Sequence, residues 1–292
     1  MKNNVLVIGG SGFLGSHVVY QLLLNDFKVT NLDTNPCNIS DSNLTHVIAN
    51  IVEDLSFLIE NKNKFDYVLN FAGISDLDYC HKNPKEALTV NILSNLNILD
   101  LLKDSNSIKK YVYASSAYAS GTSGSFYAIG KKACENIIKE YSENYNLNFT
   151  ILRYGSLYGL GSDKRNSIYR FLKSATKDSI IKYSGTGEEV REFINVKDAA
   201  ELTIESFKKE YDKNILMLTG TKSMKYKNLF DMINEIFNNS LTIKIEKNHN
   251  KTHYKNTPYS YQKDIVKKLT NNPHIDLGEG LIEIVESFSD EN

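Results

Sequence analysis

The chain has 292 residues, of which 41% are hydrophobic and 24% are charged. These values are ordinary for a globular protein, and the length suffices for one large or two modest domains. The 34 Lys and Arg residues nearly balance 35 Asp and Glu residues, to a net charge of -1, so nothing favours a nucleic-acid partner. Three separated cysteines lack metal-ligand spacing, and no apolar run reaches about 18 residues. The sequence therefore predicts a cytoplasmic protein without a metal site or a membrane span.

Short apolar runs alternate with stretches of helical periodicity in the first half of the chain. Strands are expected at Val5–Ile8, Lys28–Leu32, Thr45–Ala49, Tyr67–Phe71, Tyr111–Ala114 and Thr150–Arg153. Helices are expected at Ser16–Leu24, Pro84–Leu102 and Tyr127–Tyr145. Strands separated by helices indicate βαβ units. The predicted fold class is therefore α/β, a doubly wound parallel sheet of the Rossmann type in residues 1–155.

The alternation weakens after Gly155, where a smaller region of mixed α/β structure is expected. Helices are expected at Arg165–Lys177, Lys197–Lys209, Tyr226–Phe237 and Leu281–Phe288, and strands at Ile180–Ser184, Ile215–Thr219 and Leu241–Glu246. We expect residues 156–195 and 221–292 to form this smaller region. Residues 196–220 are expected to return to the first domain.

A glycine-rich loop follows the first strand and opens the first helix. Its glycines are Gly9, Gly12 and Gly15, and between them lie Ser11, Phe13 and Leu14. Glycines let the backbone turn tightly and approach a pyrophosphate, and the helix N-terminus attracts the phosphates. A glycine-rich turn in another α/β fold is the alternative. The preceding strand, the following helix and a downstream acidic residue favour a dinucleotide site.

That acidic residue is Asp33, which ends the second strand 18 residues after Gly15. A carboxylate at this place can accept both hydroxyls of the adenosine ribose. It would repel a 2′-phosphate, and no Arg is near in the sequence to compensate. The predicted cofactor is therefore NAD rather than NADP.

A second group consists of Ser116, Tyr127 and Lys131. Tyr127 and Lys131 are four residues apart at the start of a helix and share one face. An ammonium near a phenol lowers its pKa, which suits a general base, and Ser116 can donate a hydrogen bond to substrate. Tyr169/Lys173 and Tyr259/Lys263 have the same spacing, so position carries the prediction: only Tyr127 follows a strand that ends in serines.

With these motifs the chain resembles an extended short-chain dehydrogenase/reductase of the nucleotide-sugar epimerase/dehydratase group, typified by UDP-glucose 4-epimerase. The resemblance covers nearly the whole chain. The matching segments are Gly9–Gly15, Asp33, Asn70–Gly73, Asn91, Tyr113–Ser116, Tyr127/Lys131, Arg153–Gly159 and Arg191–Asp198. It implies an NAD-binding first domain and a substrate-binding smaller region.

The resemblance also implies roles for individual residues. The backbone of Phe71, Ala72 and Gly73 would line the cofactor, and Asn91 would steady that backbone. Lys131 would bind the nicotinamide ribose as well, and Tyr154 would border the nicotinamide. Arg191 would grip the diphosphate of the sugar nucleotide, which suits a guanidinium. The alternative for Arg191 is a surface ion pair with Glu188 or Glu189.

Some positions depart from the family pattern. Asn50, followed by Ile51, occupies the place where many relatives have Asp against the adenine, and an amide oxygen can still accept that hydrogen bond. Ser156 stands where epimerases often have Asn near the diphosphate, and Ser75 replaces a larger residue beside the substrate. The connection from Ser116 to Tyr127 is short, and such a connection normally helps to shape the sugar pocket.

Several reactions use this scaffold. Dehydratases usually carry acidic residues just after the serine, whereas Ala117 and Tyr118 follow Ser116 here. The Cys/His pair of a GDP-fucose-synthase-type enzyme is also missing, because Ala117 takes the Cys position, and the adjacent Cys80 and His81 are interpreted as helix-entry residues. C4 epimerisation of a nucleotide sugar with Tyr127 as base remains. A 4-keto reductase or dehydrogenase and a non-catalytic NAD-binding protein are the alternatives.

The helices at 84–102 and 127–145 correspond to those that form the dimer interface of relatives. Their apolar stripe includes Leu88, Ile92, Leu96 and Leu99, although the same stripe could face the core. We predict a homodimer. The C-terminal stretch with His253, Tyr254 and Tyr259 is a further candidate for the substrate pocket, without assigned roles.

Overall fold

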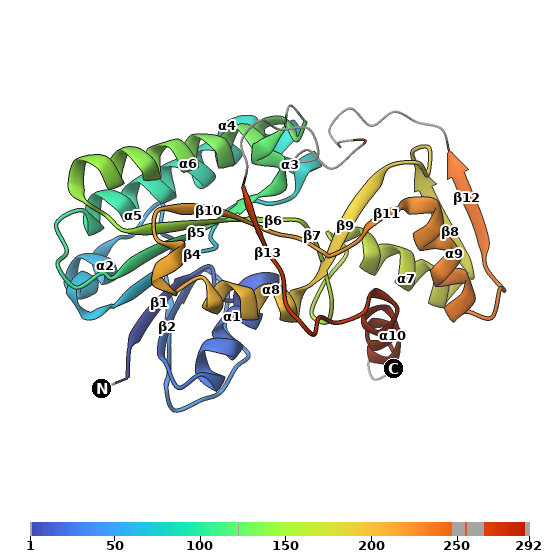
Figure 1. The fold of residues 1–292 in the computed structure, drawn as a ribbon, viewed down its shortest axis with the longest axis horizontal. Coiled ribbons are helices and arrows are strands. Elements are labelled where there is room, and N and C mark those ends of the chain that lie inside the picture. The colour runs from blue at the N-terminus through green and yellow to red at the C-terminus, as the bar shows by residue number, and fades with distance from the viewer. Residues whose placement is uncertain (1, 122, 247–254, 256–265, 290–292) are drawn as a thin grey trace.

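A computed structural model of the chain describes residues 2–121, 123–246, 255 and 266–289 (Figure 1). Its largest element is an eight-stranded sheet in the order β13-β10-β6-β5-β4-β1-β2-β3. Each neighbouring pair in this sheet is parallel. The strands are β1 (Asn4–Ile8), β2 (Lys28–Asp33), β3 (Leu44–Ile48), β4 (Tyr67–Asn70), β5 (Lys110–Ser116), β6 (Phe149–Tyr154), β10 (Asn214–Leu218) and β13 (Lys267–Leu269). The predicted α/β class with a doubly wound parallel sheet is confirmed.

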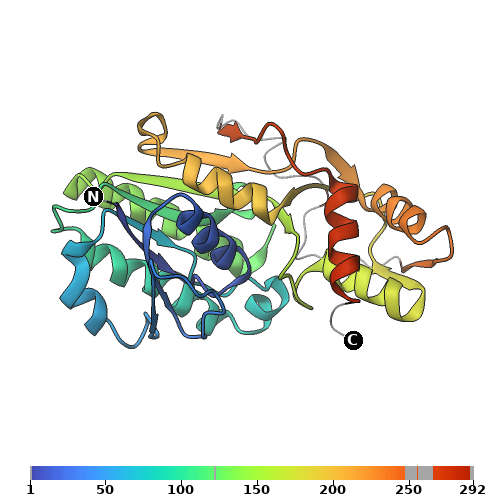
Figure 2. The same cartoon turned by 90° about the horizontal axis from the view of Figure 1, so that it is seen from below.

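Helices cover both faces of the large sheet (Figures 1 and 2). One face packs against α1 (Phe13–Leu24) and α8 (Val196–Glu205). The other packs against α2 (Ser56–Asn61), α5 (Ser94–Leu102) and α6 (Ser125–Tyr145). Because both faces are covered, every residue of β5 and of β6 is buried, including polar and charged ones.

Within the described residues, the smaller part of the molecule contains two small sheets and three helices. Strand β9 (Val190–Asn195) lies between β7 (Ser156–Tyr158) and β11 (Ser223–Lys225), and β8 (Ile180–Ser184) pairs with β12 (Thr242–Glu246). The helices are α7 (Ser167–Asp178), α9 (Tyr226–Ile236) and α10 (Leu277–Ser287). Phe171, Tyr183, Tyr226 and Phe230 pack ring against ring at the centre of this part.

Several elements differ from the sequence prediction. The expected helix 84–102 consists of α4 (Pro84–Leu88), a π-helical turn Thr89–Leu93 and α5. The short elements α2, α3 (Leu77–Lys82), β7, β9, β11 and β13 were not predicted. Strand β13 also lies in the large sheet beside β10, whereas the sequence placed residues 267–269 in the smaller region.

No helix in the described ranges has the length and apolarity needed to cross a membrane.

Candidate active site

Many of the predicted site residues lie at one edge of the large sheet. Strands β1, β2, β4, β5 and β6 are parallel, so their carboxyl ends meet at the same edge. The loop Gly9–Gly15 follows β1, Asp33 ends β2, Phe71 follows β4 and Ser116 ends β5. This edge is where ligands bind in open α/β sheets.

The glycine loop is packed too closely to accept larger residues. Gly9 has a φ of +84°, and a Cβ there would come within 2.6 Å of the Ala72 nitrogen. A Cβ at Gly15 would lie 2.2 Å from the carbonyl oxygen of Gly9. Helix α1 begins at Phe13 with no side-chain cap and no acidic residue in its first turn. Its N-terminal amides and positive dipole end are thus available to an anion.

Asp33 holds the loop from the neighbouring strand. Its carboxylate accepts hydrogen bonds from the backbone amides of Ser11 at 2.9 Å and Asn35 at 2.9 Å. Oδ1 also accepts from the Asn35 side-chain amide at 3.2 Å, whereas Oδ2, which accepts from Ser11, has a second lone pair for a ligand hydroxyl. The glycine cradle, the uncapped helix and the carboxylate fit the diphosphate and ribose of NAD.

The two residues predicted near the adenine have other contacts as well. The Asn50 side-chain oxygen accepts the amide of Val52 at 3.1 Å, which closes a local turn. The Ile51 side chain is buried in the core that includes Leu58. Only the backbone of Ile51 can therefore contribute to a cofactor site.

The backbone after β4 is fixed by two buried asparagines. Asn70 accepts the amide of Ala72 at 3.1 Å. Asn91, in the π-helical turn, accepts the amide of Ile74 at 2.7 Å and donates to its carbonyl at 3.1 Å. A Cβ at Gly73 would lie 2.6 Å from the Asn91 oxygen. The structure thus agrees with the expectation that Asn91 steadies this segment, and π-helical turns often occur at functional sites.

Ser116, Tyr127 and Lys131 lie together beyond β5. Their side chains are nearly buried, with exposed fractions of 7%, 8% and 6%. The Lys131 ammonium donates to the Ala114 carbonyl at 2.7 Å and lies 5.9 Å from the centre of the Tyr127 ring. A Cβ on Gly73 would be 3.9 Å from the same ammonium, which places Lys131 beside the predicted cofactor segment.

Burial dominates the ionisation of this group. It raises the pKa of Tyr127 to about 12, and the hydrogen bond with Ser116 opposes that rise. It also lowers the pKa of Lys131 to about 8. The expectation of a lowered pKa for Tyr127 is therefore wrong for this structure, because the loss of solvation outweighs the favourable neighbours of the phenol.

Sequence reasoning missed two neighbours of Tyr127. Tyr118 packs edge-on against its ring, with centroids 6.2 Å apart. Cys80 is buried in the same cluster. The interpretation of Cys80 and His81 as helix-entry residues is wrong, because both lie in α3, where the His81 ring bonds the Ser125 hydroxyl at 3.0 Å. The packing of α3 against α6 is not indicated by the local sequence.

The remaining candidates lie on and beside β6, β7 and β9. Tyr154 is buried, and its hydroxyl lies 2.7 Å from that of Thr203 in α8, so the predicted place of its ring beside the nicotinamide stays a prediction. Ser156 is half-buried in β7, and Ser75 is exposed beside α3.

Arg191 in β9 is buried rather than exposed at the surface. Its guanidinium lies 5.4 Å from the centre of the Tyr226 ring. Glu188 pairs with Lys225 at 2.7 Å, and Glu189 accepts backbone amides of its own turn. These contacts weaken the alternative of a surface pair between Arg191 and either carboxylate. His253, Tyr254 and Tyr259 lie outside the described residues.

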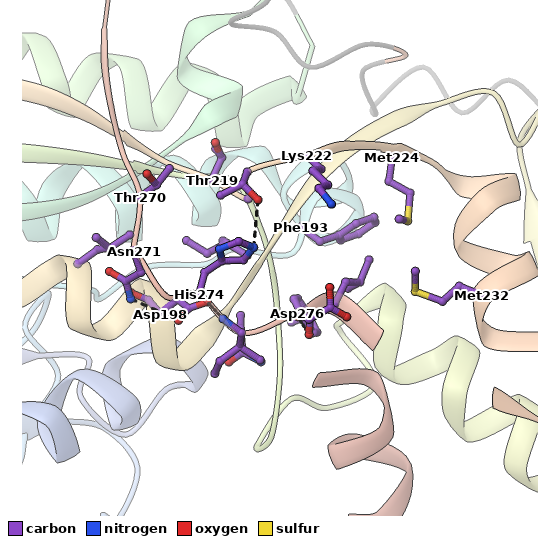
Figure 3. Close-up of a pocket in the computed structure, with 18 residues that line it drawn as sticks. Phe193, Asp198, Thr219, Lys222, Met224, Met232, Thr270, Asn271, His274 and Asp276 are labelled. Carbon is purple, nitrogen blue, oxygen red and sulfur yellow. Dashed lines mark hydrogen bonds between the residues drawn. The ribbon is translucent and has the colours of Figure 1, made fainter. Parts of the chain in front are cut away.

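A separate cavity of about 140 Å³ lies on the α8 side of β9 (Figure 3). His274, Asp198, Met224 and Met232 are among the described residues that line it, and no predicted site residue is. His274 bonds the Thr221 hydroxyl at 3.3 Å. This cavity is therefore distinct from the group around Tyr127.

Comparison with known proteins identifies the family. The model of the NAD dependent epimerase/dehydratase family matches residues 5–216. A UDP-glucuronate 4-epimerase of Thermodesulfobacterium geofontis is 31% identical over 77% of this chain and 72% of its own.

Solved structures agree with that result. A UDP-N-acetylglucosamine 4-epimerase from Methanobrevibacter ruminantium M1 is 26% identical, with a TM-score of 0.85 over 100% of both chains. A Bacillus cereus UDP-glucuronic acid 4-epimerase, solved with UDP-glucuronic acid and NAD, has the same fold with 20% identity. Its TM-score is 0.85 over 99% of this chain and 100% of its own.

Proposed function

Because the chain belongs to the NAD dependent epimerase/dehydratase family, we propose that it epimerises a nucleotide-diphosphate sugar at C4 through a 4-keto intermediate. The observation that carries this proposal is the buried group of Ser116, Tyr127 and Lys131 beside Gly73. It lies at the sheet edge that also carries the glycine loop and Asp33. Relatives that act at C4 of UDP-sugars support the substrate class.

In the proposed reaction Gly9–Gly15, Asp33 and Lys131 would hold NAD, which would supply a hydride acceptor and donor. Tyr127 removes the proton of the C4 hydroxyl and returns it when the keto group is reduced. Ser116 donates a hydrogen bond to the same oxygen. Rotation of the keto sugar between the two steps inverts C4.

The charges of Tyr127 and Lys131 suit this proton transfer when they are treated as a pair. The first proton leaves the pair near pH 8, since the pKa of Lys131 is about 8 and that of Tyr127 about 12. A Tyr127 phenolate beside a Lys131 ammonium has the same number of protons as the two neutral groups. The phenolate–ammonium form is therefore a minor tautomer of the neutral pair, reached by moving a proton within the pair rather than by loss of a second proton.

The smaller part of the molecule is proposed to hold the nucleotide diphosphate. Arg191 supplies the cation, and the Tyr226 ring against it limits its orientation. Ser156 and Ser75 are proposed to contact the diphosphate and the sugar. Dehydration is disfavoured because neither of the two residues after Ser116 carries a carboxylate. Ala117 is buried, and the Tyr118 ring packs on Tyr127.

The first test is mass spectrometry of freshly purified, denatured protein, together with turnover of a panel of UDP-sugars. Stoichiometric NAD and interconversion of C4 epimers are expected. Protein without bound dinucleotide that instead consumes added cofactor would identify the 4-keto reductase or dehydrogenase. Tyr127→Phe should retain NAD and lose about 100- to 10,000-fold in turnover. Absence of turnover with every sugar nucleotide would favour a non-catalytic NAD-binding protein.

The homodimer and the cytoplasmic location stay predictions. Leu93 beside α5 and Ile129 in α6 are 39% and 57% exposed, which supports an apolar contact between two copies of these helices. Light scattering should give twice the chain mass of 33.1 kDa. A monomeric mass at micromolar concentration would contradict the dimer.

A further inference from the structure

A buried ion pair lies directly behind the group around Tyr127. Glu135 in α6 and Arg153 in β6 are 0% and 2% exposed. Arg153 binds the carboxylate through two nitrogens, Nε at 2.8 Å and Nη2 at 2.7 Å. This fork geometry fixes the position of both side chains, which a single contact would not.

The same pair bonds two serines on either side of Ser116. The Ser115 hydroxyl donates to Glu135 at 2.6 Å, and Arg153 Nη1 donates to the Ser120 hydroxyl at 2.6 Å. Ser115 is the next-to-last residue of β5, and Ser120 ends the 3₁₀ turn Ala117–Ser120 that follows the strand. The pair therefore joins β5, this turn, α6 and β6.

Each anchored residue is adjacent to a proposed site residue. Ser115 directly precedes Ser116 in β5, and the Ser116 side chain forms a hydrogen bond with that of Tyr127. The bond from Ser115 to Glu135 therefore fixes the backbone immediately before Ser116. Glu135 lies one helical turn after Lys131 on the same face of α6.

We propose that Glu135 and Arg153 are positioning residues that hold Ser116 at the end of β5 in register with Tyr127 and Lys131 on α6. This inference rests on the proposed function for its catalytic readout. A displacement of about 1 Å between reacting groups can reduce a rate by about 100-fold. Such a displacement is the expected result when the pair no longer joins β5 to α6.

The pair also sets the charge near Lys131. The titratable groups that face Lys131 are Tyr127, Cys134 and Glu135 of α6, Tyr113 of β5 and Cys80 of α3. Burial raises the pKa of both thiols and of both phenols, so these groups are neutral near pH 7. Glu135 is the carboxylate among these groups and favours the charged form of Lys131. The guanidinium of Arg153 in turn neutralises the charge of Glu135.

The first experiment removes the pair without leaving an unpaired buried charge. The double variant Glu135→Leu/Arg153→Met should fold, because replacing a buried ion pair by apolar residues often leaves stability little changed. We expect it to retain NAD and a KM within about threefold, and to lose about 100-fold in kcat. Retention of kcat within about threefold in this folded variant would overturn the proposal.

A matched control exists at the other end of β5. The buried Lys110 pairs with the partly exposed Asp212 at 2.6 Å, at the amino end of the strand. The double variant Lys110→Met/Asp212→Leu should keep kcat within about threefold, since distant sites act independently. Equal loss of kcat in both double variants would show a general effect of core pairs and contradict positioning.

The second experiment measures the pKa of Lys131 by carbon-13 NMR of lysine-labelled protein, with the signal assigned from Lys131→Met. Glu135→Gln should lower this pKa, because it removes the anion and leaves the Arg153 cation. Arg153→Met should raise it, because Glu135 is no longer neutralised. Arg153→Lys keeps the cation and should leave it nearly unchanged.

The two experiments separate this inference from the proposed function. If wild-type protein turns over no sugar nucleotide, the proposed function fails, yet the NMR titration needs no substrate. Opposite shifts in Glu135→Gln and Arg153→Met then still support the arrangement of the pair around Lys131. Shifts in the same direction would overturn it, as expected for unspecific loosening of the core.

Discussion

The two ends of β5 carry the same kind of chemistry for different purposes. At its amino end the buried Lys110 ammonium bonds the carbonyls of Ser206, Phe207 and Lys208 at 2.9, 3.2 and 2.9 Å, just after α8. At its carboxyl end Glu135 and Arg153 bond Ser115 and Ser120. The first arrangement closes a helix end, and the second stands behind Tyr127.

The choice of cation follows from the geometry at each end. An ammonium has three donors that point in different directions, which suits several carbonyl oxygens at the end of α8. A guanidinium has a planar fork, which suits one carboxylate and a fixed orientation. Buried charge thus stabilises the amino edge of the sheet and fixes side-chain geometry at the carboxyl edge.

The largest expected effect is at the carboxyl end, in Lys131→Met. Turnover should fall by about 100-fold or more, because the phenolate of Tyr127 loses its cation. The protein should nevertheless become more stable at pH 7 by roughly 1–2 kcal/mol. A pKa lowered from 10.5 to about 8 makes the buried ammonium unfavourable by about 3 kcal/mol, partly offset by its bond to Ala114.

The pH dependence of the stability gained by Lys131→Met provides a control for this prediction. Because the pKa of Lys131 is lowered by folding, the unfolded chain binds the extra proton between pH 8 and pH 10.5. Wild-type stability therefore gains from Lys131 as pH rises through this window, and the penalty is complete below pH 8. Urea denaturation at pH 7 and pH 10 should show the advantage of Lys131→Met shrinking. An advantage that grows would contradict the assignment.

The variant Lys110→Met tests the role of the amino end of β5. Loss of the ammonium leaves buried carbonyls of the α8 end and the Asp212 carboxylate without their partner. We expect a loss of about 3 kcal/mol in the free energy of unfolding, measured by urea denaturation. Because Lys110 is far from Tyr127, kcat at 20 °C should stay within about threefold of wild type. A large drop in kcat in a fully folded variant would contradict a purely stabilising role for Lys110.

The pH dependence of wild-type kcat is a further test of the group at the carboxyl end of β5. If the pair of Tyr127 and Lys131 must lose one proton to react, kcat rises about tenfold per pH unit below pH 8 and levels off above it. The measurement is initial-rate kinetics at saturating sugar nucleotide from pH 6 to pH 9.5. A flat profile would indicate that another step limits turnover.

The features of the fold and of the site that the sequence predicts are those encoded by residues close together in the chain. The glycine loop, Asp33 and Ser116 follow apolar runs in the sequence, and parallel strands bring such positions to one edge. The fold class and the grouping of these residues could therefore be predicted. The extent of the large sheet could not, because β13 pairs with β10 through a contact between residues more than 40 apart.

The contacts of the site were harder to foresee for the same reason. The packing of Cys80 on Tyr127 requires that α3 lies on α6, and α3 has only six residues with little helical pattern. The fork between Glu135 and Arg153 joins a helix to a strand 18 residues away. The direction of the Tyr127 pKa depends on burial, which no spacing of charged residues reports.

The smallest expected effect comes from Lys109, the neighbour of Lys110. Its ammonium pairs with Asp66 at 2.9 Å, but the lysine side chain is 54% exposed. Exposed pairs contribute about 0–1 kcal/mol and are screened by salt, so Lys109→Met should change the free energy of unfolding by less than about 1 kcal/mol. That small change should vanish in 1 M NaCl, whereas the loss in Lys110→Met should persist because no counter-ions reach the buried ammonium. Equal losses in the two variants would show that charge alone, rather than burial, stabilises the amino end of β5.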